Sequence, residues 1–339
     1  MPAGKRANRS CSSVQKRLRP GLILFLVAIL FSGCGPDKRV RIIKLAHVLN
    51  IEHPVHKSMV FLARRLKEKS GGRMRVDIYP GGQLGQERDL IELLQIGSLA
   101  MTKVSSAPLE SFVPEMKIFG IPYLFRDEAH RWDVLNGPIG RRLLLAGQDC
   151  YLRGIGYYDA GSRSFYTKDK SIQSPDDLRG LKIRVMKSIT SVQMVQSLGG
   201  SATPISWGEL YTALQQGVVD GAENNPPSFY TSRHYEVCKY YSMDEHTSPP
   251  DILLMSTVVW QSLEPEEKHW LQEAVDESVV HQRRLWKEAT ELSLAEVKKA
   301  GVEILRPDKG PFLDSVRAMH DSYRGTHIYD LIMEIQDIQ

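Results

Sequence analysis

Residues 181–223 read LKIRVMKSITSVQMVQSLGGSATPISWGELYTALQQGVVDGAE, and this stretch decides the fold. Three short apolar runs in it are typical of buried strands, at residues 181–185, 202–205 and 218–223. The segments between these runs, 189–198 and 207–216, space their apolar residues as helices do, and each is followed by glycine. The alternation of strand and helix predicts a sheet with helices on both faces.

The amino-terminal half repeats the same units. We expect strands at residues 41–48, 73–79 and 99–104, and helices at residues 56–69 and 86–97. Because two such sets each need a core of their own, the chain is predicted to be an α/β protein with two similar domains.

A single long helix is expected after Pro265, because no Gly or Pro interrupts the helical spacing until about residue 300. Some 35 residues of helix extend about 50 Å, more than one domain of this size can bury. Its apolar residues do not sustain heptads, as a coiled coil would require. We therefore expect a strut that crosses both domains.

The amino terminus is typical of an export signal. Its first 33 residues carry six Lys or Arg and no acid, and residues 21–32 form an uncharged run too short to span a bilayer. Without these residues, 38 basic side chains face 40 acidic ones, so the apparent basicity gives no support to nucleic-acid binding. We predict a signal peptide over residues 1–33 and a mature protein outside the cytoplasm.

Residues 31–34, Phe-Ser-Gly-Cys, resemble the bacterial lipoprotein box, in which Cys34 would be acylated. Lipid chains on Cys34 would anchor the protein to a membrane surface; plain export with cleavage nearby is the alternative. The remaining cysteines of the mature chain, Cys150 and Cys238, are either a disulfide or two buried thiols.

Common enzyme signatures are absent: the chain has no GxSxG, HExxH, Walker A or GxGxxG. His53 and His56 lack a third metal ligand at diagnostic spacing, so we predict no metal site and no cofactor. The polar residues that need explaining are Arg163, Arg184 and Asn224, at predicted strand ends where α/β sheets open onto a ligand crevice. Converging there, they would form a carboxylate receptor, although structural ion pairs explain such arginines equally well.

Several stretches resemble one family, the extracytoplasmic solute-binding proteins of TRAP transporters (the dicarboxylate-binding, DctP-type family). The similarity covers nearly all of residues 40–320. The stretches that carry it are YPGGQLGQER (79–88), QIGSL (95–99), IPYLF (121–125), DDLRGLKIRV (176–185), GGSATP (199–204), ELYTALQ (209–215) and VDGAEN (219–224).

The resemblance implies a two-lobed clamp of the periplasmic-binding-protein type, which closes over its ligand by hinge bending, with a long helix crossing both domains. We assign residues 40–160 and about 245–285 to lobe I, and residues 161–244 and about 286–339 to lobe II.

The resemblance also implies the substrate-binding residues. Arg184 holds the ligand carboxylate, assisted by Arg163 and Asn224. Trp207 is placed to stack on the ligand, and Glu87 to bind its hydroxyl groups. Ser105 stands where relatives that bind sialic acid carry an acidic residue, which argues against that ligand. We add Lys103 and His246 as weaker candidates for a polar wall on the first domain.

A polar wall suits a ligand with several hydroxyl groups, so we expect a sugar acid such as glucuronate, galacturonate or an aldonate, and a TRAP permease as the membrane partner. The protein is then a transport component in the periplasm or on the outer face of the cytoplasmic membrane. The alternatives are a C4-dicarboxylate-binding protein, a ligand sensor for a receptor kinase, and an enzyme using Glu87, His246 and Asp251 as an acid/base set.

Overall fold

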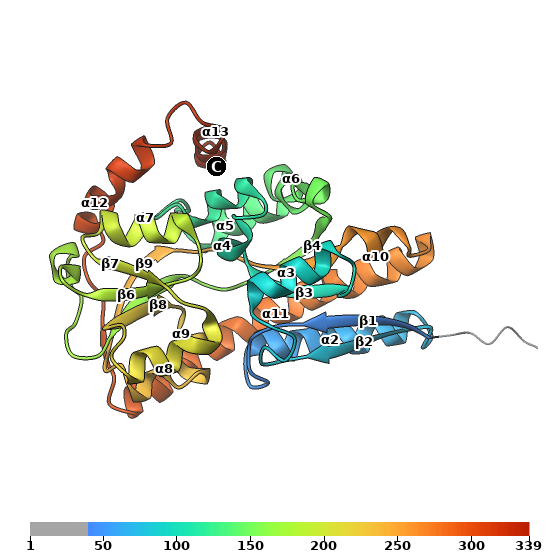
Figure 1. Cartoon of the computed structure of the whole chain (residues 1–339), viewed down its shortest axis with the longest axis horizontal. Helices are drawn as coiled ribbons and strands as arrows, with labels where there is room; N and C mark the ends of the chain where they lie inside the picture. The colour runs from blue at the N-terminus through green and yellow to red at the C-terminus, as the bar shows by residue number, and fades with distance from the viewer. Residues whose placement is uncertain (1–39, 339) are drawn as a thin grey trace, which may run out of the picture. The chain divides into compact units, whose positions relative to one another are not determined.

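The computed structural model describes residues 40–338, and within them the strands form two sheets (Figure 1). The first sheet has the order β2-β1-β3-β10-β4, with bounds Met74–Tyr79, Arg41–Ala46, Met101–Ser105, Asp251–Ser256 and Leu152–Tyr158. The second has the order β11-β9-β5-β8-β6-β7, with bounds Glu303–Leu305, Tyr240–Thr247, Arg163–Thr167, Gly221–Asn224, Lys182–Val185 and Ser201–Pro204.

The helices flank these sheets. The α-helices are α2 (Pro54–Lys69), α3 (Glu87–Gln95), α4 (Ser106–Leu109), α5 (Glu128–Asn136), α6 (Pro138–Leu145), α7 (Ile189–Ser197), α8 (Leu210–Gln215), α9 (Pro226–Thr231), α10 (Thr257–Gln261), α11 (Pro265–Lys299), α12 (Gly310–Asp321) and α13 (His327–Gln336). Short 3-10 turns lie at η1 (Pro114–Gly120), η2 (Gln148–Cys150), η3 (Pro175–Leu178), η4 (Trp207–Glu209) and η5 (His234–Glu236).

The predicted α/β class is confirmed, and the predicted elements lie within a few residues of the observed ones. β1 pairs in parallel with β2 and β3, and β6 pairs in parallel with β7 and β8, as strand-helix-strand units require. Each sheet also has antiparallel pairs, because β10 runs against β3 and β4, and β5 runs against β8 and β9. The predicted helix 207–216 starts as the 3-10 turn η4 and continues as α8.

Each sheet carries apolar layers on both faces. On one face of the first sheet, α2 and α11 bury residues such as Leu62 and Leu271. One face of the second sheet packs on α8 and α9, with Phe229 at its centre. The remaining faces share one cluster that runs from Leu94 of α3 to Leu331 of α13. One hydrophobic cluster is therefore continuous between the two sheets.

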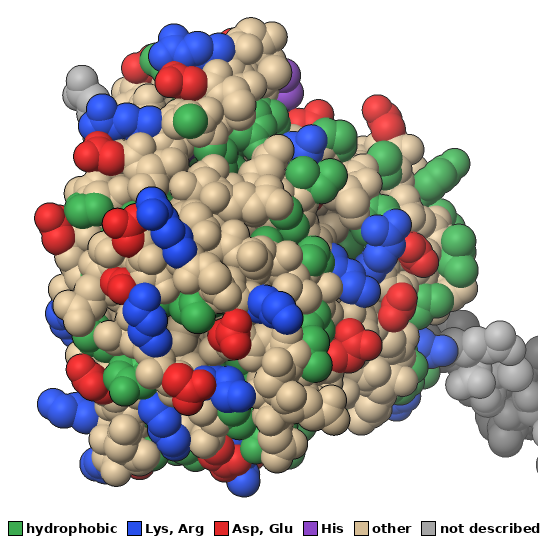
Figure 2. All heavy atoms as spheres, turned by 60° about the vertical axis from the view of Figure 1, so that its left-hand side comes forward, with side chains coloured by type: hydrophobic (Ala, Val, Ile, Leu, Met, Phe, Trp, Pro, Cys, Tyr) green, Lys and Arg blue, Asp and Glu red, His purple; other side chains and the backbone are tan. Residues whose placement is uncertain are grey.

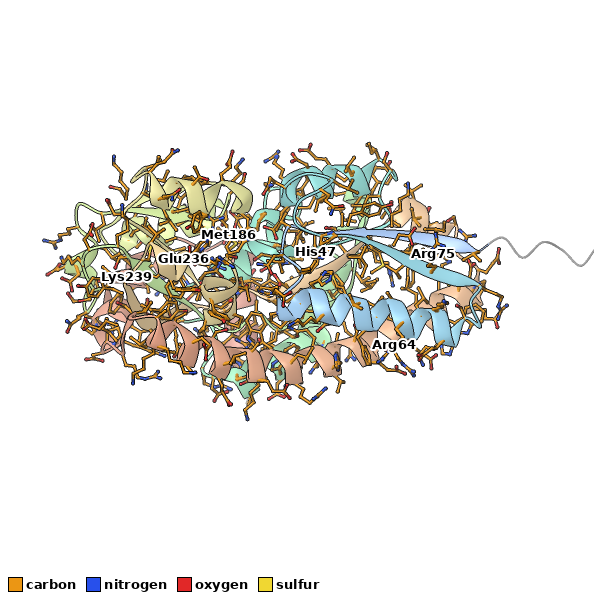
Figure 3. The ribbon with its side chains drawn as sticks, turned by 90° about the horizontal axis from the view of Figure 1, so that it is seen from below. His47, Arg64, Arg75, Met186, Glu236 and Lys239 are labelled. Atoms are coloured by element: carbon orange, nitrogen blue, oxygen red, sulfur yellow. The ribbon has the colours of Figure 1, made fainter. Side chains whose placement is uncertain are left out.

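The predicted long helix is present as α11, whose 35 residues pack on α2 and then on α9 (Figure 3). Pro265 opens the helix, and a capping box between Glu264 and Glu267 satisfies its first backbone donors. Glu277 of α11 pairs with Arg65 and, at 2.8 Å, with Lys69 of α2. Because α2 lies by the first sheet and α9 by the second, α11 contacts both halves.

Two short segments join the sheets side by side, residues 159–162 between β4 and β5 and residues 248–250 between β9 and β10. The hydroxyls of Ser162 and Ser248 lie 3.0 Å apart. Gln282 of α11 holds the first segment by accepting from the backbone N–H of Asp159 at 2.7 Å and donating to its carbonyl at 2.8 Å. Gly161 has φ +58°, and a Cβ there would approach the Trp286 indole nitrogen to 2.9 Å, so glycine fits this crossover best.

The final helix contacts residues from the first half of the chain. α13 packs on η1, and His130 of α5 contacts the carbonyl oxygen of Ile335 at 2.9 Å. Both η1 and α5 belong to residues 40–160, whereas residues 286–339 were assigned to lobe II. The division into lobes stays a prediction.

The predicted signal peptide, Cys34 and its acylation lie outside the described residues. Within residues 40–338 no helix is both long and apolar enough to cross a membrane. Cys150 and Cys238 are free thiols, and burial raises the pKa of Cys238 to about 12. On the face shown in Figure 2, basic and acidic side chains are interspersed.

Candidate ligand-binding site

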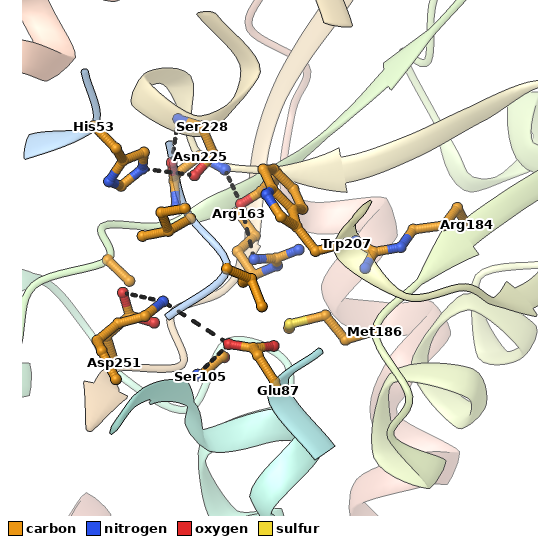
Figure 4. A pocket seen from close by; sticks show the side chains of 15 residues that line it. His53, Glu87, Ser105, Arg163, Arg184, Met186, Trp207, Asn225, Ser228 and Asp251 are labelled. Carbon is orange, nitrogen blue, oxygen red and sulfur yellow. Dashed lines mark hydrogen bonds and ion pairs between the residues drawn. The ribbon is translucent and has the colours of Figure 1, made fainter. Parts of the chain in front are cut away.

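A cavity lies between the two sheets, next to the crossover segments (Figure 4). The space outside the atoms amounts to about 490 Å³, counted together with the open solvent at its mouth. Seven of the eight predicted site residues line it: Glu87, Lys103, Ser105, Arg163, Arg184, Trp207 and Asn224. The structure brings these residues together around one space.

Within residues 40–338, Arg184 is a buried cation that forms no ion pair with a carboxylate. It lies on β6, opposite Thr203 of β7 and Ala222 of β8, and is 2% exposed. Its Nε donates to the carbonyl oxygen of Ile205 at 2.8 Å, and among the described residues Nη1 has no hydrogen-bond acceptor. Burial lowers the pKa of Arg184 from its ordinary value, and the charges of Glu223 and Glu87, which act in the opposite direction, do not outweigh the loss of water.

Arg163 is equally buried but fully engaged by the protein. It begins β5, where the pairing with β9 shifts register between Arg163 and Phe165, and its side chain contacts β8. Its Nε pairs with Glu223, and its Nη2 donates to a carboxylate oxygen and the carbonyl oxygen of Glu223 at 2.9 and 2.7 Å. Nη1 donates to Asn224 Oδ1 at 2.8 Å. Arg163 therefore forms part of the cavity wall, and its charge is neutralised by Glu223.

The structure corrects the position predicted for His246. Its imidazole is fully buried on β9 and does not line the cavity. Nδ1 contacts Asp244 at 2.8 Å and Nε2 lies 3.5 Å from Glu223, so the imidazole turns toward these two carboxylates instead of the ligand space. The predicted acid/base set of Glu87, His246 and Asp251 therefore does not assemble in the cavity.

Strong pKa shifts accompany this buried network. Burial alone would lower the pKa of His246, but Asp244 and Glu223 outweigh it and raise the pKa to about 9. Burial alone would raise the pKa of Glu223, but Arg163 and His246 hold it at about 2. Glu223 is therefore an anion between two cations.

The first-sheet wall of the cavity carries two carboxylates and one ammonium group. Lys103 Nζ lies 3.0 Å from Asp251 and 3.8 Å from Glu87. Glu87 begins α3, and its Oε1 accepts from the backbone N–H of Ser105 at 2.9 Å. Burial raises the pKa of Glu87, while Lys103 and the Ser105 N–H act in the opposite direction. This wall offers several hydrogen-bond acceptors to a ligand.

The aromatic side chain of the site is half-buried. Trp207 lies in η4, and its ring centroid is 5.9 Å from the Arg184 guanidinium carbon. The next residue, Gly208, donates its N–H to the side chain of Gln86 at 3.1 Å, which links the second-sheet half to the loop before α3. The Trp207 ring is thus placed where the two sides of the cavity meet.

Eight further residues line the cavity without having been predicted as binding residues: Val48, Leu49, His53, Ala160, Met186, Asn225, Ser228 and Asp251. His53 caps α2 by accepting from Val55 N–H at 3.2 Å, and its Nε2 lies 3.2 Å from Ser228 Oγ. Asn225 follows Asn224 directly, so the Asn-Asn pair was a usable signal. Ser228 and Met186 had none, and Asp251 had been considered only in the enzyme hypothesis.

The arrangement suits a small organic anion. A guanidinium group binds a carboxylate through two parallel hydrogen bonds, and carboxylate side chains accept from hydroxyl groups. No cluster of three or more His, Cys, Asp or Glu suited to a metal ion occurs in residues 40–338.

The sequence matches the family described as bacterial extracellular solute-binding protein, family 7 (DctP), over residues 45–326. It is 41% identical over 322 residues to the protein YiiZ of Salmonella typhimurium, covering 94% of this chain and 98% of that protein. The chain belongs to the DctP family of TRAP solute-binding proteins.

Solved structures agree with this assignment. A TRAP periplasmic solute-binding protein from Bradyrhizobium, in complex with galacturonate, has a TM-score of 0.85 and 41% identity, covering 88% of this chain and all of that one. A TRAP protein from Pseudomonas putida with bound D-glucuronate also has a TM-score of 0.85, with 34% identity, covering 88% and 97%. The predicted two-lobed binding-protein fold is confirmed by this likeness.

Proposed function

We propose that the cavity binds a sugar acid such as glucuronate or galacturonate, and that the protein delivers it to a TRAP-type membrane permease. One observation carries the proposal: Arg184 is buried at the cavity with Nη1 unpartnered among the described residues. Removing a charge from water without a partner is costly, so such a guanidinium suits a ligand that supplies the missing anion.

The wall opposite Arg184 supports a polyhydroxylated ligand. Glu87 and Asp251 of the first-sheet wall present carboxylate oxygens, and Asn224 and Asn225 add amides from the second-sheet side. A bare four-carbon dicarboxylate has few donors for these acceptors, whereas a hexuronate has several hydroxyl groups. The bound galacturonate and glucuronate of the two structural relatives support the same ligand class.

The remaining parts of the proposal concern partner and location. Family membership supports a membrane permease as the recipient and the periplasm as the place of binding. A lipid on Cys34 would hold the protein at the outer face of the cytoplasmic membrane. We propose no catalytic role, since the polar groups of the cavity are arranged for holding an acid.

A thermal-shift screen of acids tests the ligand class. A ligand at a hundred times its Kd adds about 2.7 kcal/mol to the free energy of unfolding, which is readily measured as a higher Tm. We expect glucuronate, galacturonate or an aldonate to raise the Tm, with the affinity then measured by calorimetry. If malate and succinate raise the Tm and the sugar acids do not, the proposal is wrong.

A further inference from the structure

The charged groups around the cavity are unevenly distributed. On the second-sheet side, Glu223 neutralises Arg163, which leaves Arg184 as the unpaired cation among the residues described. On the first-sheet side, Glu87 and Asp251 share a single ammonium group, that of Lys103. With these groups ionised, one end of the cavity has an excess positive charge and the other an excess negative charge.

We infer that the cavity selects acids by the number of their carboxylates: it accepts one carboxylate at Arg184 and excludes a ligand with a second carboxylate at the Glu87–Asp251 end. This inference rests on the proposed function and deepens it, because it names the charge class of the substrate. It makes Glu87 a specificity-determining residue.

The exclusion follows from the chemistry of the first-sheet wall. An ionised carboxylate only accepts hydrogen bonds, so Glu87 and Asp251 pair with hydroxyl groups and not with another carboxylate. A second ligand carboxylate would lie beside like charges in a site with little water, and such contacts discriminate strongly against wrong partners.

Lys103 does not relieve this repulsion. The side chain of Lys103 is 4% exposed, and its ammonium group already lies 3.0 Å from Asp251 and 3.8 Å from Glu87. Turning it toward a ligand carboxylate would leave a buried carboxylate of the protein unpaired, which is itself unfavourable. Ser105 is uncharged, and its backbone N–H already donates to Glu87.

The test compares two open-chain acids that differ at one end. Galactonate has one carboxylate, and galactarate has a second carboxylate in place of the terminal hydroxymethyl group. Calorimetric titration at pH 8 should give galactonate at least a 30-fold lower Kd than galactarate, equivalent to about 2 kcal/mol at about 1.4 kcal/mol per tenfold. Succinate should bind no better than galactarate.

Glu87→Gln is the decisive variant, because the amide keeps the shape and an acceptor for the Ser105 N–H while removing the charge. We expect this variant to reduce the ratio of the galactarate Kd to the galactonate Kd at least tenfold, mainly by strengthening galactarate binding. Glu92→Gln is the matched control, since Glu92 is exposed on the same helix and pairs with Arg88. It should leave the ratio unchanged.

The outcomes separate the inference from the proposed function. If wild-type protein binds galactarate and galactonate equally, or if Glu87→Gln leaves their ratio unchanged, selection by charge is wrong while sugar-acid binding stands. If no sugar acid binds at all, the proposed function and the inference fall together.

Discussion

Two regions of the second sheet each bury an arginine beside the cavity, and they differ in how the charge is compensated. At the start of β5, Arg163 meets Glu223 and Asn224 with three of its nitrogen atoms. On β6, Arg184 meets a single carbonyl oxygen and has an unpartnered Nη1 within the described chain. Arg163 and Arg184 are buried to a similar extent, at 5% and 2% exposed. They differ in their ion pairing: Arg163 is paired and supports the fold, whereas Arg184 is available to a ligand.

The largest loss of stability is expected when the ion pair between Arg163 and Glu223 is broken. Glu223→Gln leaves Arg163 without its carboxylate and removes one of the two anions beside His246, and orphaning a buried charge costs about 3–5 kcal/mol. Chemical denaturation at neutral pH should show that loss in the free energy of unfolding. Glu209→Gln, an exposed change, is the control and should lose less than about 0.5 kcal/mol. Equal stability of the two variants would mean that the Arg163 pair contributes little to the fold.

Exchanging each arginine for methionine sharpens the comparison. Arg184→Met should weaken sugar-acid binding about 30-fold to a few thousand-fold, from a loss of about 2–5 kcal/mol, while leaving the empty protein as stable as the wild type or more so. Arg163→Met should instead lower the free energy of unfolding, because it orphans Glu223.

Arg184→Lys should restore little affinity, since an ammonium group cannot form the two parallel bonds of a guanidinium. Calorimetry that gave near-wild-type affinity for this lysine variant would contradict the bidentate arrangement.

The paired region should also make stability depend on pH. The pKa of His246 is raised to about 9, so its contribution is fully present below its unfolded pKa of about 6.5 and is lost as pH rises through 9. The free energy of unfolding should fall by about 3 kcal/mol across this window. His246→Gln should flatten that decline, whereas His269→Gln, at an exposed position on α11, should not. An unchanged slope in His246→Gln would show that another group titrates there.

Trp207 is expected to have the smallest effect, on ligand binding alone. Trp207→Leu removes the ring near Arg184, and loss of a stacking contact of about 0.5–1.5 kcal/mol should raise the Kd for a uronate about three- to tenfold. Trp207→Phe should recover most of it. An open-chain aldonate, which has no ring to stack, should be affected less. Equal losses for both acids would assign Trp207 a packing role.

Most of the fold and much of the site could be predicted from the sequence, because both depend on local patterns. Strand and helix periodicity gave the units of both sheets, and the absence of Gly and Pro gave α11. Strand-end position and family resemblance gave Arg184, Arg163 and Asn224. A structural ion pair was one of two open alternatives for such arginines, and Glu223 was not predicted as the partner of Arg163, since side-chain pairing across β5 and β8 leaves no local signal in the sequence.

His246 shows where such reasoning fails. It is predicted as a weaker candidate for the polar wall, but side-chain direction at this position depends on the local backbone, and Glu245 has φ +52°. Ser228 reaches the cavity only through the packing of α9 against the start of α2, a contact between residues 175 positions apart. Such long-range contacts cannot be predicted from a short sequence motif.

The unpaired guanidinium of Arg184 has a thermodynamic consequence for the empty protein. Folding has already stripped water from this group, so its dehydration penalty falls on the folding reaction and not on association with the acid. The unliganded protein is therefore less stable than it would be without this charge, and the carboxylate binds to a guanidinium group that needs no further dehydration. The charge of Arg184 thus both strengthens ligand binding and lowers the stability of the unliganded fold.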